Sequence, residues 1–449
     1  MKIVVIGGGP AGMLAAIAAT KSNTNNLEKV NEPSQVILLE KNEKLGKKLF
    51  ISGKGRCNLT NDCDRDEFFK NIVTNPKFFY SAYSEFSNED LKKLIEDNGC
   101  KLKVERGNRV FPVSDKSYDV IDALKKALKA AGVKVKLNTE VKSIQLSRMG
   151  ELREPDESRR GEHCEPVSFT IMTNNNEKII ADKVIIATGG LSYPSTGSTG
   201  DGYKFAKEFS INVIEQSPSL VPFNIKEVDE CKKMQGLTLK NVAIKIFDND
   251  NEKKPLYEDF GELLFTHFGV SGPVILSGSC YIKEAKNKVL SIDLKPALSE
   301  EQLDARLIRE IDENKNKKLK SLIESLLPSS MVEVFLDRLN VLVSEENSKA
   351  INIEEIKNTE LDKETRKLII KLLKDFRYTI TSKRGFEEAI VTSGGIDVKE
   401  LNPKTMESKK VKGLYFAGEV IDIDAMTGGF NIQIACSTGF AAGKSVNDI

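Results

Sequence analysis

The chain has 449 residues, long enough for several domains with sizeable buried cores. Lysine and arginine number 67 against 66 aspartates and glutamates, so the formal net charge is +1. A dedicated nucleic-acid-binding protein would normally carry a basic excess, and we therefore expect no nucleic-acid partner. The hydrophobic content of 40% excludes a chain that is disordered throughout.

Seven cysteines at irregular spacing do not form a disulfide framework, and they predict a reducing, intracellular compartment. The apolar start is similar to a signal peptide, but Gly7, Gly8, Gly9 and Pro10 interrupt it and no cleavage site follows. No uncharged apolar run reaches the roughly 18 residues that a transmembrane helix needs. We therefore expect a cytoplasmic protein with no membrane partner. The sequence does not define the oligomeric state.

The N-terminal half predicts a parallel sheet with helical connections. Residues 2–6 and 35–39 are short apolar runs typical of strands buried on both faces, and the alanine-rich residues 13–20 between them predict a helix. Residues 119–131 have helical spacing that Gly132 ends, and residues 133–137 alternate like a strand. The polar residues 147–166 predict a loop. Residues 167–187 predict a hairpin, with its turn at 174–176, that returns to the sheet.

The C-terminal half changes character twice. Residues 211–295 contain short β-like runs, including 242–247 and 289–294. Residues 299–376 are rich in leucine, isoleucine, lysine and glutamate with helical periodicity, which predicts a helical subdomain whose charge run at 315–320 is a solvated face. The β pattern resumes near residue 389, with a buried strand at 414–417 and a helix at 431–446.

The sharpest motif is Gly7-x-Gly9-x-x-Gly12, because it follows a predicted strand, opens a helix and lies in a βαβ unit that ends in an acid. Gly7 permits the tight turn, Gly9 lets a pyrophosphate approach the backbone, and Gly12 permits close packing of helix and sheet. The helix N-terminus offers free N–H groups to the phosphates. Glu40 can accept both hydroxyls of an adenosine ribose and disfavours a 2′-phosphate. The motif therefore predicts FAD or NAD rather than NADP; the alternative is a glycine-rich turn beside a surface glutamate.

Two further features favour FAD. A buried strand ends in the turn Ala187-Thr188-Gly189-Gly190, and a second strand ends at Gly418-Glu419, where the carboxylate can bond a ribityl chain. A helix starting near Asn431 would direct its N–H groups at the pyrimidine edge of the flavin, where the reduced ring is negative. Small residues would let this helix pack close to the sheet; they are Gly439, Ala441, Ala442 and Gly443.

The combined motifs resemble one family. They are Gly7–Gly12 with Glu40-Lys41, Ser52-Gly-Lys-Gly-Arg56-Cys57-Asn58-Leu-Thr-Asn61, Ala187–Gly190, Tyr193–Gly202, residues 261–273 and residues 418–433. Across nearly the whole chain they resemble the BaiN-like (YhiN-like) FAD-dependent oxidoreductases, some of which bear the names aminoacetone oxidase and 3-dehydro-bile-acid reductase. The resemblance is specific for the family and not for a substrate.

The resemblance implies an α/β fold: a Rossmann-type, glutathione-reductase-like FAD-binding domain (1–205 and 399–449), an inserted β-barrel-like domain (206–298 and 377–398) and a helical subdomain (299–376). It implies FAD contacts at Ala11, Glu40, Lys47, Lys48, Cys57, Asn58, Val141, Asp422, Asn431 and Ile432. The motifs add further candidate cofactor-binding residues: Gly7, Gly9, Pro10, Gly12, Lys41, Arg56, Ala187, Thr188, Gly189, Gly418, Glu419 and Gly429.

Catalytic side chains are few. Cys57 and Cys63 are separated by five residues, which would put their sulfurs on different faces of a helix, so we expect Cys57 to pack beside the cofactor rather than to form a redox disulfide. His267 is a candidate proton donor or substrate contact at the flavin, with a histidine bonded within the barrel as the alternative. His163 lies in a polar insert. Arg56 is expected to pair with the pyrophosphate or with an acidic substrate group. No spacing predicts a metal site.

These features predict an enzyme, an FAD-dependent oxidoreductase with non-covalent FAD. We expect an NAD(P)H-linked reductase of a small organic substrate that works by hydride transfer at flavin N5. The sequence holds no second Gly-x-Gly-x-x-Gly unit, so NAD(P)H would bind transiently at the flavin face. The alternatives are a flavin oxidase of a small amine that uses O₂ and a non-catalytic flavin-binding sensor or scaffold.

Overall fold

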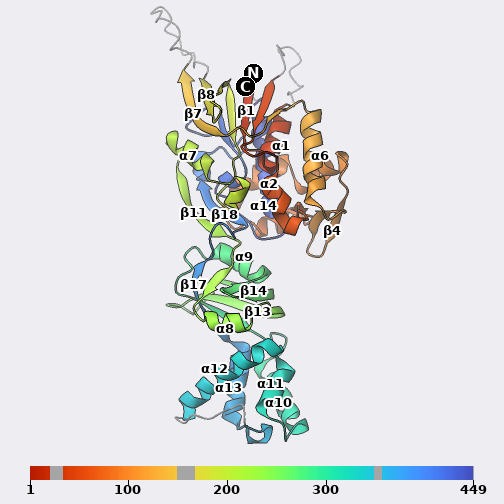
Figure 1. Cartoon of the computed structure of the whole chain (residues 1–449), viewed down its shortest axis with the longest axis vertical. Helices are drawn as coiled ribbons and strands as arrows, with labels where there is room; N and C mark the ends of the chain where they lie inside the picture. The colour runs from red at the N-terminus through yellow and green to blue at the C-terminus, as the bar shows by residue number, and fades with distance from the viewer. Residues whose placement is uncertain (21–33, 149–166, 348–355, 448–449) are drawn as a thin grey trace, which may run out of the picture. The chain divides into compact units, whose positions relative to one another are not determined.

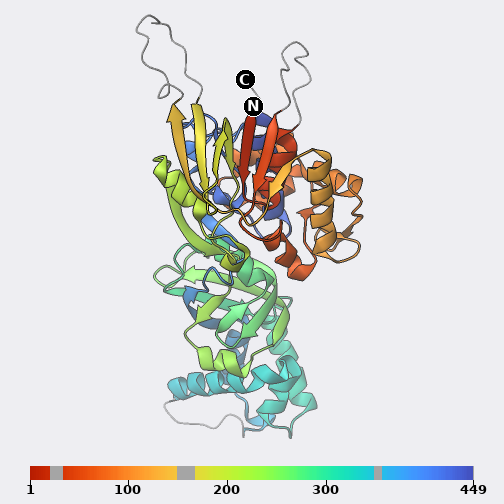
Figure 2. The same cartoon turned by 45° about the horizontal axis from the view of Figure 1, so that its top comes forward.

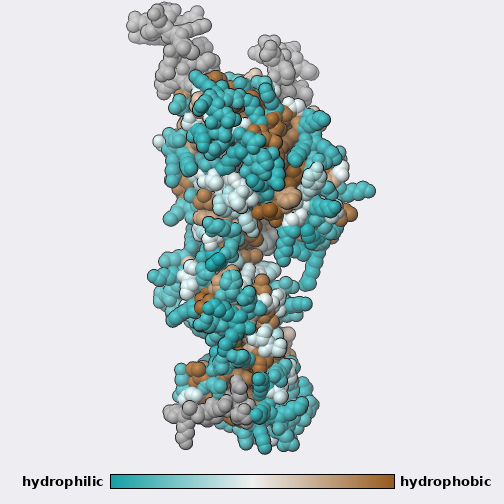
Figure 3. Space-filling model, in the orientation of Figure 1, coloured by the Kyte–Doolittle hydropathy of each residue, from teal (hydrophilic) through white to brown (hydrophobic). Residues whose placement is uncertain are grey.

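The computed structural model describes residues 1–20, 34–148, 167–347 and 356–447 (Figure 1). The chain forms two compact units. The first unit combines Met1–Ser219 with Phe386–Ile449, and the second is Leu220–Gly385. Figure 3 shows hydrophilic residues over most of the visible face, with apolar residues in smaller patches.

A parallel five-stranded sheet forms the centre of the first unit, in the order β19-β10-β1-β2-β6. Its central strands are buried because their apolar runs face helices and small sheets on both sides. Figure 2 shows β1 and β2 side by side, as the predicted βαβ unit requires. The strands are β1 (Lys2–Ile6), β2 (Gln35–Leu39), β6 (Lys134–Lys136), β10 (Lys183–Ile186) and β19 (Leu414–Phe416).

Helices α1 (Pro10–Ala19) and α14 (Phe430–Ser445) pack against each other, which brings the N-terminal and C-terminal parts of the chain together. A Cβ atom on Gly439 would lie 2.2 Å from the carbonyl oxygen of Ala11, and one on Gly443 would lie 2.1 Å from that of Ala15. These glycines of α14 therefore pack against the backbone of α1, whereas the sequence predicted that they pack against the sheet. Helix α1 begins at Pro10 rather than at residue 13, because proline is well suited to the first helical position.

The remaining elements of the first unit surround this core. The helices are α2 (Lys47–Ile51), α3 (Arg65–Lys70), α4 (Pro76–Glu85), α5 (Asn88–Asp97), α6 (Ser117–Ala130) and α7 (Asp201–Glu208), with short 3₁₀ turns at Ser52–Gly55, Pro194–Thr196, Val398–Glu400 and Gly418–Val420. Small antiparallel sheets are formed by β3 (Thr60–Asn61), β4 (Leu102–Glu105) and β5 (Arg109–Pro112), by β7 (Val141–Arg148), β8 (Val167–Thr173) and β9 (Lys178–Ala181), and by β11 (Val213–Ser219) and β18 (Val391–Ile396).

The second unit contains a closed barrel, in the strand order β12-β15-β14-β13-β16-β17. Large apolar side chains fill it, and Phe223, Phe265 and Phe376 are fully buried. This confirms the predicted barrel. Its strands are β12 (Phe223–Ile225), β13 (Thr238–Asp248), β14 (Tyr257–Thr266), β15 (Gly269–Ser271), β16 (Lys288–Asp293) and β17 (Phe376–Lys383), and it carries the helices α8 (Val228–Lys233) and α9 (Pro273–Tyr281).

The helical region predicted for this unit is also confirmed. Ser299 starts the first of its helices with a capping box, and Leu303 and Leu307 repeat at the helical period and are fully buried. The helices are α10 (Glu300–Glu313), α11 (Leu319–Leu326), α12 (Ser329–Asn347) and α13 (Lys363–Lys374), with a 3₁₀ turn at Asn358–Glu360.

Strand β7 continues to Arg148, so the polar stretch predicted as a loop from residue 147 starts as a strand. The rest of that stretch, including His163, lies outside the described residues. In the part of the chain that the structure describes, no helix is both long enough and apolar enough to cross a membrane.

Candidate functional site

The candidate site lies at the carboxyl edge of the parallel sheet. Strand β1 runs into Gly7, β2 into Glu40, β10 into Ala187 and β19 into Ala417, directly before Gly418. Because the carboxyl ends of parallel strands meet at one edge, the sheet brings these motif residues together from distant parts of the sequence. This edge is where open α/β sheets bind their ligands.

The glycine turn at this edge is tightly packed on one side and open on the other. Gly7 has φ +107°, and a Cβ on it would lie 2.4 Å from the carbonyl oxygen of Ala187. A Cβ on Gly12 would lie 1.8 Å from the Gly7 carbonyl oxygen. A Cβ on Gly9, by contrast, would have no heavy atom within 4 Å, and the helix that starts at Pro10 has no side-chain cap. The turn therefore offers open space and free helix N–H groups, which fits a pyrophosphate.

Glu40 is fixed beside this turn. Its Oε2 accepts a 2.7 Å hydrogen bond from the Gly8 N–H, and its Oε1 accepts from the backbone and side-chain N–H groups of Asn42 at 2.8 and 2.7 Å. A carboxylate has about four acceptor positions, so these three bonds orient it and leave capacity for a ribose hydroxyl. Glu40 as a whole is 8% exposed, at the end of β2 where the sequence predicted the ribose contact.

Glu419 is held by side chains and backbone from three other segments. Its carboxylate accepts hydrogen bonds from the Lys48 ammonium, from the Ser192 hydroxyl and from the Thr392 N–H, the last at 2.9 Å. The Thr392 hydroxyl in turn accepts from the N–H groups of Leu191 at 2.8 Å and Ser192 at 3.0 Å. Ser192 and Thr392 are buried, and the sequence analysis missed both. The available signal was the run Val391-Thr-Ser-Gly-Gly395, in which hydroxyl residues precede two glycines at the end of a strand.

The N-terminus of α14 is fixed by neighbouring loops. Gly429 has φ +98°, and its N–H donates to the Asn58 side-chain oxygen at 3.1 Å when that amide is oriented to satisfy both its neighbours. Asn431 accepts from the Ala425 N–H at 3.0 Å and donates to the Ala425 carbonyl at 2.7 Å. The helix begins at Phe430 without a side-chain cap, so its first N–H groups fit the electronegative edge of a ring system.

Two buried polar atoms near Glu419 have no hydrogen-bond partner among the described residues: Thr188 Oγ1 and Tyr203 Oη. Burial, together with the charges of Glu419 and Asp422, raises the pKa of Tyr203. Buried polar atoms in proteins nearly always have partners. Thr188 and Tyr203 therefore each keep an unsatisfied polar atom in the segments that follow β10 and begin α7.

Other predicted residues have partners in the first unit. Lys41 donates to Thr199 and Asp201 at 2.6 and 2.7 Å, and Lys47 donates to Asn42 at 3.3 Å. Asp422 accepts from the side chain of Asn75 at 3.0 Å, and its burial raises the pKa of its carboxyl group. Val141 is buried at the start of β7, and Ile432 is half-buried in the first turn of α14.

Arg56 is paired within the chain. Its Nε donates to Asp115 at 2.8 Å, its guanidinium pairs with Glu105, and it lies 4.2 Å from the ring centroid of Phe111. These contacts lower the pKa of Glu105, with Arg56 as the main cause. The structure therefore places Arg56 against β4 and β5, and both of its acidic partners belong to the protein.

The cysteines and histidines do not form a reactive pair in the described residues. Cys57 and Cys63 are free and buried, and burial raises the pKa of Cys57 to about 12. His267 is exposed in the turn between β14 and β15 of the second unit, edge-on to Phe268. No group of histidine, cysteine and acidic side chains among these residues is arranged to hold a metal ion.

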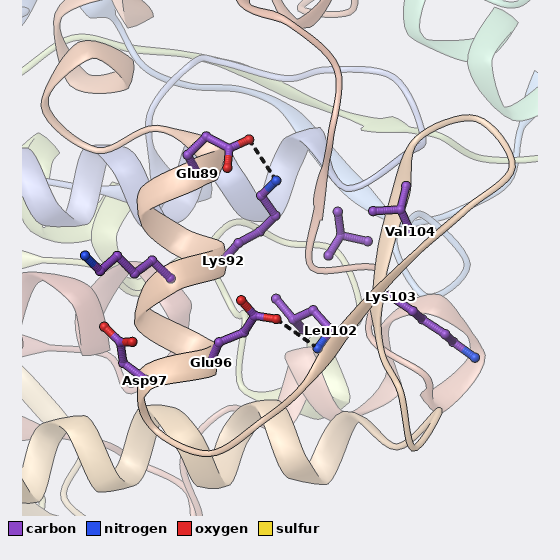
Figure 4. A pocket seen from close by; sticks show the side chains of 9 residues that line it. Glu89, Lys92, Glu96, Asp97, Leu102, Lys103 and Val104 are labelled. Carbon is purple, nitrogen blue, oxygen red and sulfur yellow. Dashed lines mark hydrogen bonds and ion pairs between the residues drawn. The ribbon is translucent and has the colours of Figure 1, made fainter.

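A separate pocket of about 320 Å³ lies between α5 and the β4–β5 hairpin (Figure 4). Several of its charged groups have partners: Lys92 donates to Glu89 at 2.7 Å, and Glu96 accepts from the Leu102 N–H at 3.4 Å. The lining contains none of the residues at the carboxyl edge of the sheet. The pocket is therefore distinct from the candidate site.

A parallel Rossmann sheet, its glycine turn, the acid after β2 and two uncapped helix N-termini together define an FAD-dependent oxidoreductase. The profile of the HI0933-like protein Rossmann domain matches residues 1–445. The chain belongs to this FAD-binding family, the one that its motifs resemble.

Three curated relatives match almost end to end. The ribosomal RNA dihydrouridine synthases of Haemophilus influenzae and Escherichia coli are 28% and 29% identical to this chain, and each alignment covers 99% of this chain and 98% and 97% of theirs. The 3-dehydro-bile acid delta(4,6)-reductase of Clostridium scindens is 28% identical, over 99% of this chain and 98% of its own. A solved 3-ketosteroid delta1-dehydrogenase from Sterolibacterium denitrificans is 13% identical over 99% of both chains, with a TM-score of 0.47.

Proposed function

We propose that this chain is a reductase that takes electrons from NAD(P)H and saturates a carbon–carbon double bond conjugated to a carbonyl group. The observation that carries the proposal is the shared chemistry of the curated relatives. A dihydrouridine synthase saturates the uracil ring beside its carbonyl, and a 3-dehydro delta(4,6)-reductase saturates double bonds conjugated to a ketone. One NAD(P)H is oxidised for each double bond, and the two carbons gain one hydride and one proton.

In this proposal the residues at the carboxyl edge hold FAD. The turn from Gly7 to Gly12 and the start of α1 bind the pyrophosphate, and Glu40 binds the adenosine ribose. Glu419, held by Thr392 and Lys48, accepts a hydrogen bond from the ribityl chain. The start of α14 at Phe430 faces the pyrimidine edge and stabilises negative charge there. FAD bound in this way supplies hydride transfer at N5.

Uridine in ribosomal RNA is the first candidate substrate, because two of the curated relatives described above bear that activity in their names. A dienone of the steroid type is the second candidate. The near-neutral net charge describes the whole chain and leaves room for a local basic surface. We also retain as a proposal the cytoplasmic location that the cysteine pattern predicts.

The test has two steps. Purified protein with bound FAD is mixed anaerobically with NADH or NADPH, and bleaching of the flavin absorbance measures reduction. The reduced protein is then given unmodified ribosomal RNA transcribed in vitro, or a 3-keto-4,6-diene steroid, and mass spectrometry measures the gain of two hydrogens. We expect reduction by at least one nicotinamide and a product from the RNA.

Each alternative function gives a different result. An amine oxidase would be reduced by a small amine and reoxidised rapidly in air, without dependence on NAD(P)H. A sensor or scaffold would bind FAD and give no turnover with any donor. Either result would replace the proposed function.

A further inference from the structure

A basic surface adjoins the candidate site. It consists of residues 53–56, residues 103–111 on the β4–β5 hairpin, and residues 114–118, and we call it the basic loop face. These segments contain six basic side chains and two acidic ones in a chain whose overall charge is balanced. The basic side chains are Lys54, Arg56, Lys103, Arg106, Arg109 and Lys116; the acidic ones are Glu105 and Asp115.

Contacts between the segments make this a single surface. Arg56 donates to Asp115 and pairs with Glu105, while Lys103 donates to Asp115 at 2.8 Å. Arg56 also lies over the ring of Phe111. Lys103 is opposite Phe111 and Glu105 is opposite Arg109 in the β4–β5 register, so these four residues share one face of the hairpin.

The ion pairs use both carboxylates and leave positive charge uncompensated. Among the described residues, Lys54, Arg106, Arg109 and Lys116 form no ion pair within 4 Å, and all four are exposed. The surface therefore presents several cations to the solvent. Such a surface attracts a polyanion, and it does so most strongly at low salt.

Two exposed aromatic side chains lie in the segment 114–118 or on a segment hydrogen-bonded to it. Tyr118 is 57% exposed and Phe50 is 45% exposed. The Ser117 hydroxyl donates to the Phe50 carbonyl at 2.7 Å, which joins the two segments, and the Lys44 ammonium lies 5.1 Å from the Phe50 ring centroid. Cations that contact phosphates, next to aromatic rings on which bases can stack, are the usual means of holding a single-stranded nucleic acid.

The loop at the edge of this surface leads into the candidate site. Gly53, Lys54 and Gly55 all have left-handed backbone conformations, with φ between +57° and +83°. A left-handed conformation is costly for lysine, and Lys54 is exposed, so core packing does not offset that cost. The chain continues directly into Cys57 and Asn58, whose side-chain amide contacts Gly429 at the start of α14.

We propose that the basic loop face binds the phosphates and unpaired bases of the RNA that presents a uridine to the flavin. This inference rests on the proposed function and adds the surface by which the macromolecular substrate is held. A small substrate would need only the pocket around the reacting bond. An RNA needs a wider contact, and this surface supplies it next to residues proposed to contact the cofactor.

The test is a charge reversal. The variant R106E/R109E/K116E is compared with K253E/K254E/K283E, which has the same change in net charge at exposed lysines of the second unit. Binding of unmodified ribosomal RNA transcribed in vitro is measured by filter retention at several salt concentrations. We expect the first variant to lose more than about tenfold in affinity and to lower the salt slope by about 2–3, because each lost phosphate contact lowers it by about 1.

Controls separate this inference from the proposed function. FAD content, the rate of flavin bleaching by NAD(P)H and the thermal midpoint should match the wild type in both variants. If the first variant misfolds, R106Q/R109Q/K116Q removes the same charges with a milder change. A single variant, Tyr118→Ala, should weaken RNA binding without changing the salt slope.

Three results would overturn the assignment. If the wild type forms dihydrouridine and both triple variants bind RNA with its affinity, the basic loop face does not bind the RNA. The proposed function would then stand without it. If heparin competes as well as RNA on an equal-charge basis, the face is a general polyanion site. If the wild type neither binds nor reduces ribosomal RNA, the proposed substrate fails and this inference fails with it.

Discussion

Thr392 and Glu419 are joined by a 2.9 Å hydrogen bond from the Thr392 N–H to Glu419 Oε1. The Thr392 hydroxyl also accepts from two N–H groups of the segment that follows the Ala187–Gly190 turn. One buried threonine therefore holds two of the loops that end parallel strands. Its position on β18, in neither of these loops, makes it a positioning residue for the site.

Thr392→Val should weaken both folding and FAD binding. The replacement keeps the shape and removes the acceptor of the Leu191 and Ser192 N–H groups. We expect a loss of about 1–3 kcal/mol in the free energy of unfolding, from urea titration. We expect a roughly tenfold weaker FAD affinity, from fluorescence titration, which corresponds to about 1.4 kcal/mol. Thr392→Ser keeps the hydroxyl and should behave like the wild type. Equal affinities in all three proteins would contradict the positioning role.

Gly9→Ala should separate cofactor binding from folding. Its backbone has φ −76°, and the added methyl group would meet no heavy atom within 4 Å in the protein. We therefore expect the thermal midpoint of the FAD-free protein to stay within about 2 °C of the wild type, because a surface change costs little. The methyl group would occupy the space where the pyrophosphate approaches, so FAD affinity should fall at least about tenfold. Unchanged affinity would place the pyrophosphate elsewhere.

Gly439→Ala is the matched opposite case. The added Cβ would lie 2.2 Å from the carbonyl oxygen of Ala11, so α1 and α14 must move apart. Overpacking of this kind costs about 1–3 kcal/mol. We expect a lower urea midpoint together with lost FAD affinity, because α14 carries the Gly429–Asn431 end of the site. A stability equal to that of the wild type would show that the helices separate without cost.

Cys57→Ala should retain flavin reduction by NAD(P)H. The thiol is buried, and burial raises its pKa to about 12, so at pH 8 it stays protonated and a poor nucleophile. We expect slow alkylation of native Cys57 by iodoacetamide at pH 8, and a stability loss of about 1–2 kcal/mol in the alanine variant. Cys63→Ala is the control. Loss of reduction in both variants, with a disulfide between the two residues by mass spectrometry, would contradict this prediction.

Asp422 should make stability depend on pH. Burial raises the pKa of its carboxyl group, the bond from Asn75 opposes this rise, and the charge of Asp424 adds to it. The folded protein therefore keeps this proton to a higher pH than the unfolded chain. The stabilising contribution is complete below the ordinary value near 3.8 and is lost as pH rises through the raised pKa.

Asp422→Asn removes that titration. The urea midpoint of the variant, relative to wild type at saturating FAD, should therefore rise from pH 4 to pH 8. The relevant quantity is how the difference in urea midpoint between variant and wild type changes with pH. Any effect of the substitution on FAD contacts adds a constant to that difference. A midpoint difference that stays flat across this range would contradict the raised pKa.

The sequence alone predicted the elements whose pattern depends only on neighbouring residues. The apolar runs of β1 and β2, the glycine turn and the periodicity of α10 to α13 each depend on neighbouring residues, and the structure has them where predicted. Glu40 also follows from local order, because it directly succeeds a buried strand.

Contacts between segments that are far apart in the sequence could not be predicted from it. Thr392 is 200 residues from Ser192, and no local pattern indicates that its hydroxyl accepts from that N–H. Arg56 was expected to pair with a pyrophosphate or an acidic substrate group, and no local pattern indicated its ion pairs with Glu105 and Asp115. The glycines of α14 predicted close packing of this helix against a neighbouring element, but only the fold shows that the neighbour is α1.

The pairing of Ser219 with Val391 puts the exit and the return of the chain on adjacent strands of one ribbon. The second unit, Leu220–Gly385, is thus one continuous stretch, a cassette inserted in the sequence between these two strands. Insertions, deletions or substitutions within such a cassette do not interrupt the parallel sheet. The residues proposed to hold the cofactor all belong to the other unit, so such changes leave them in place.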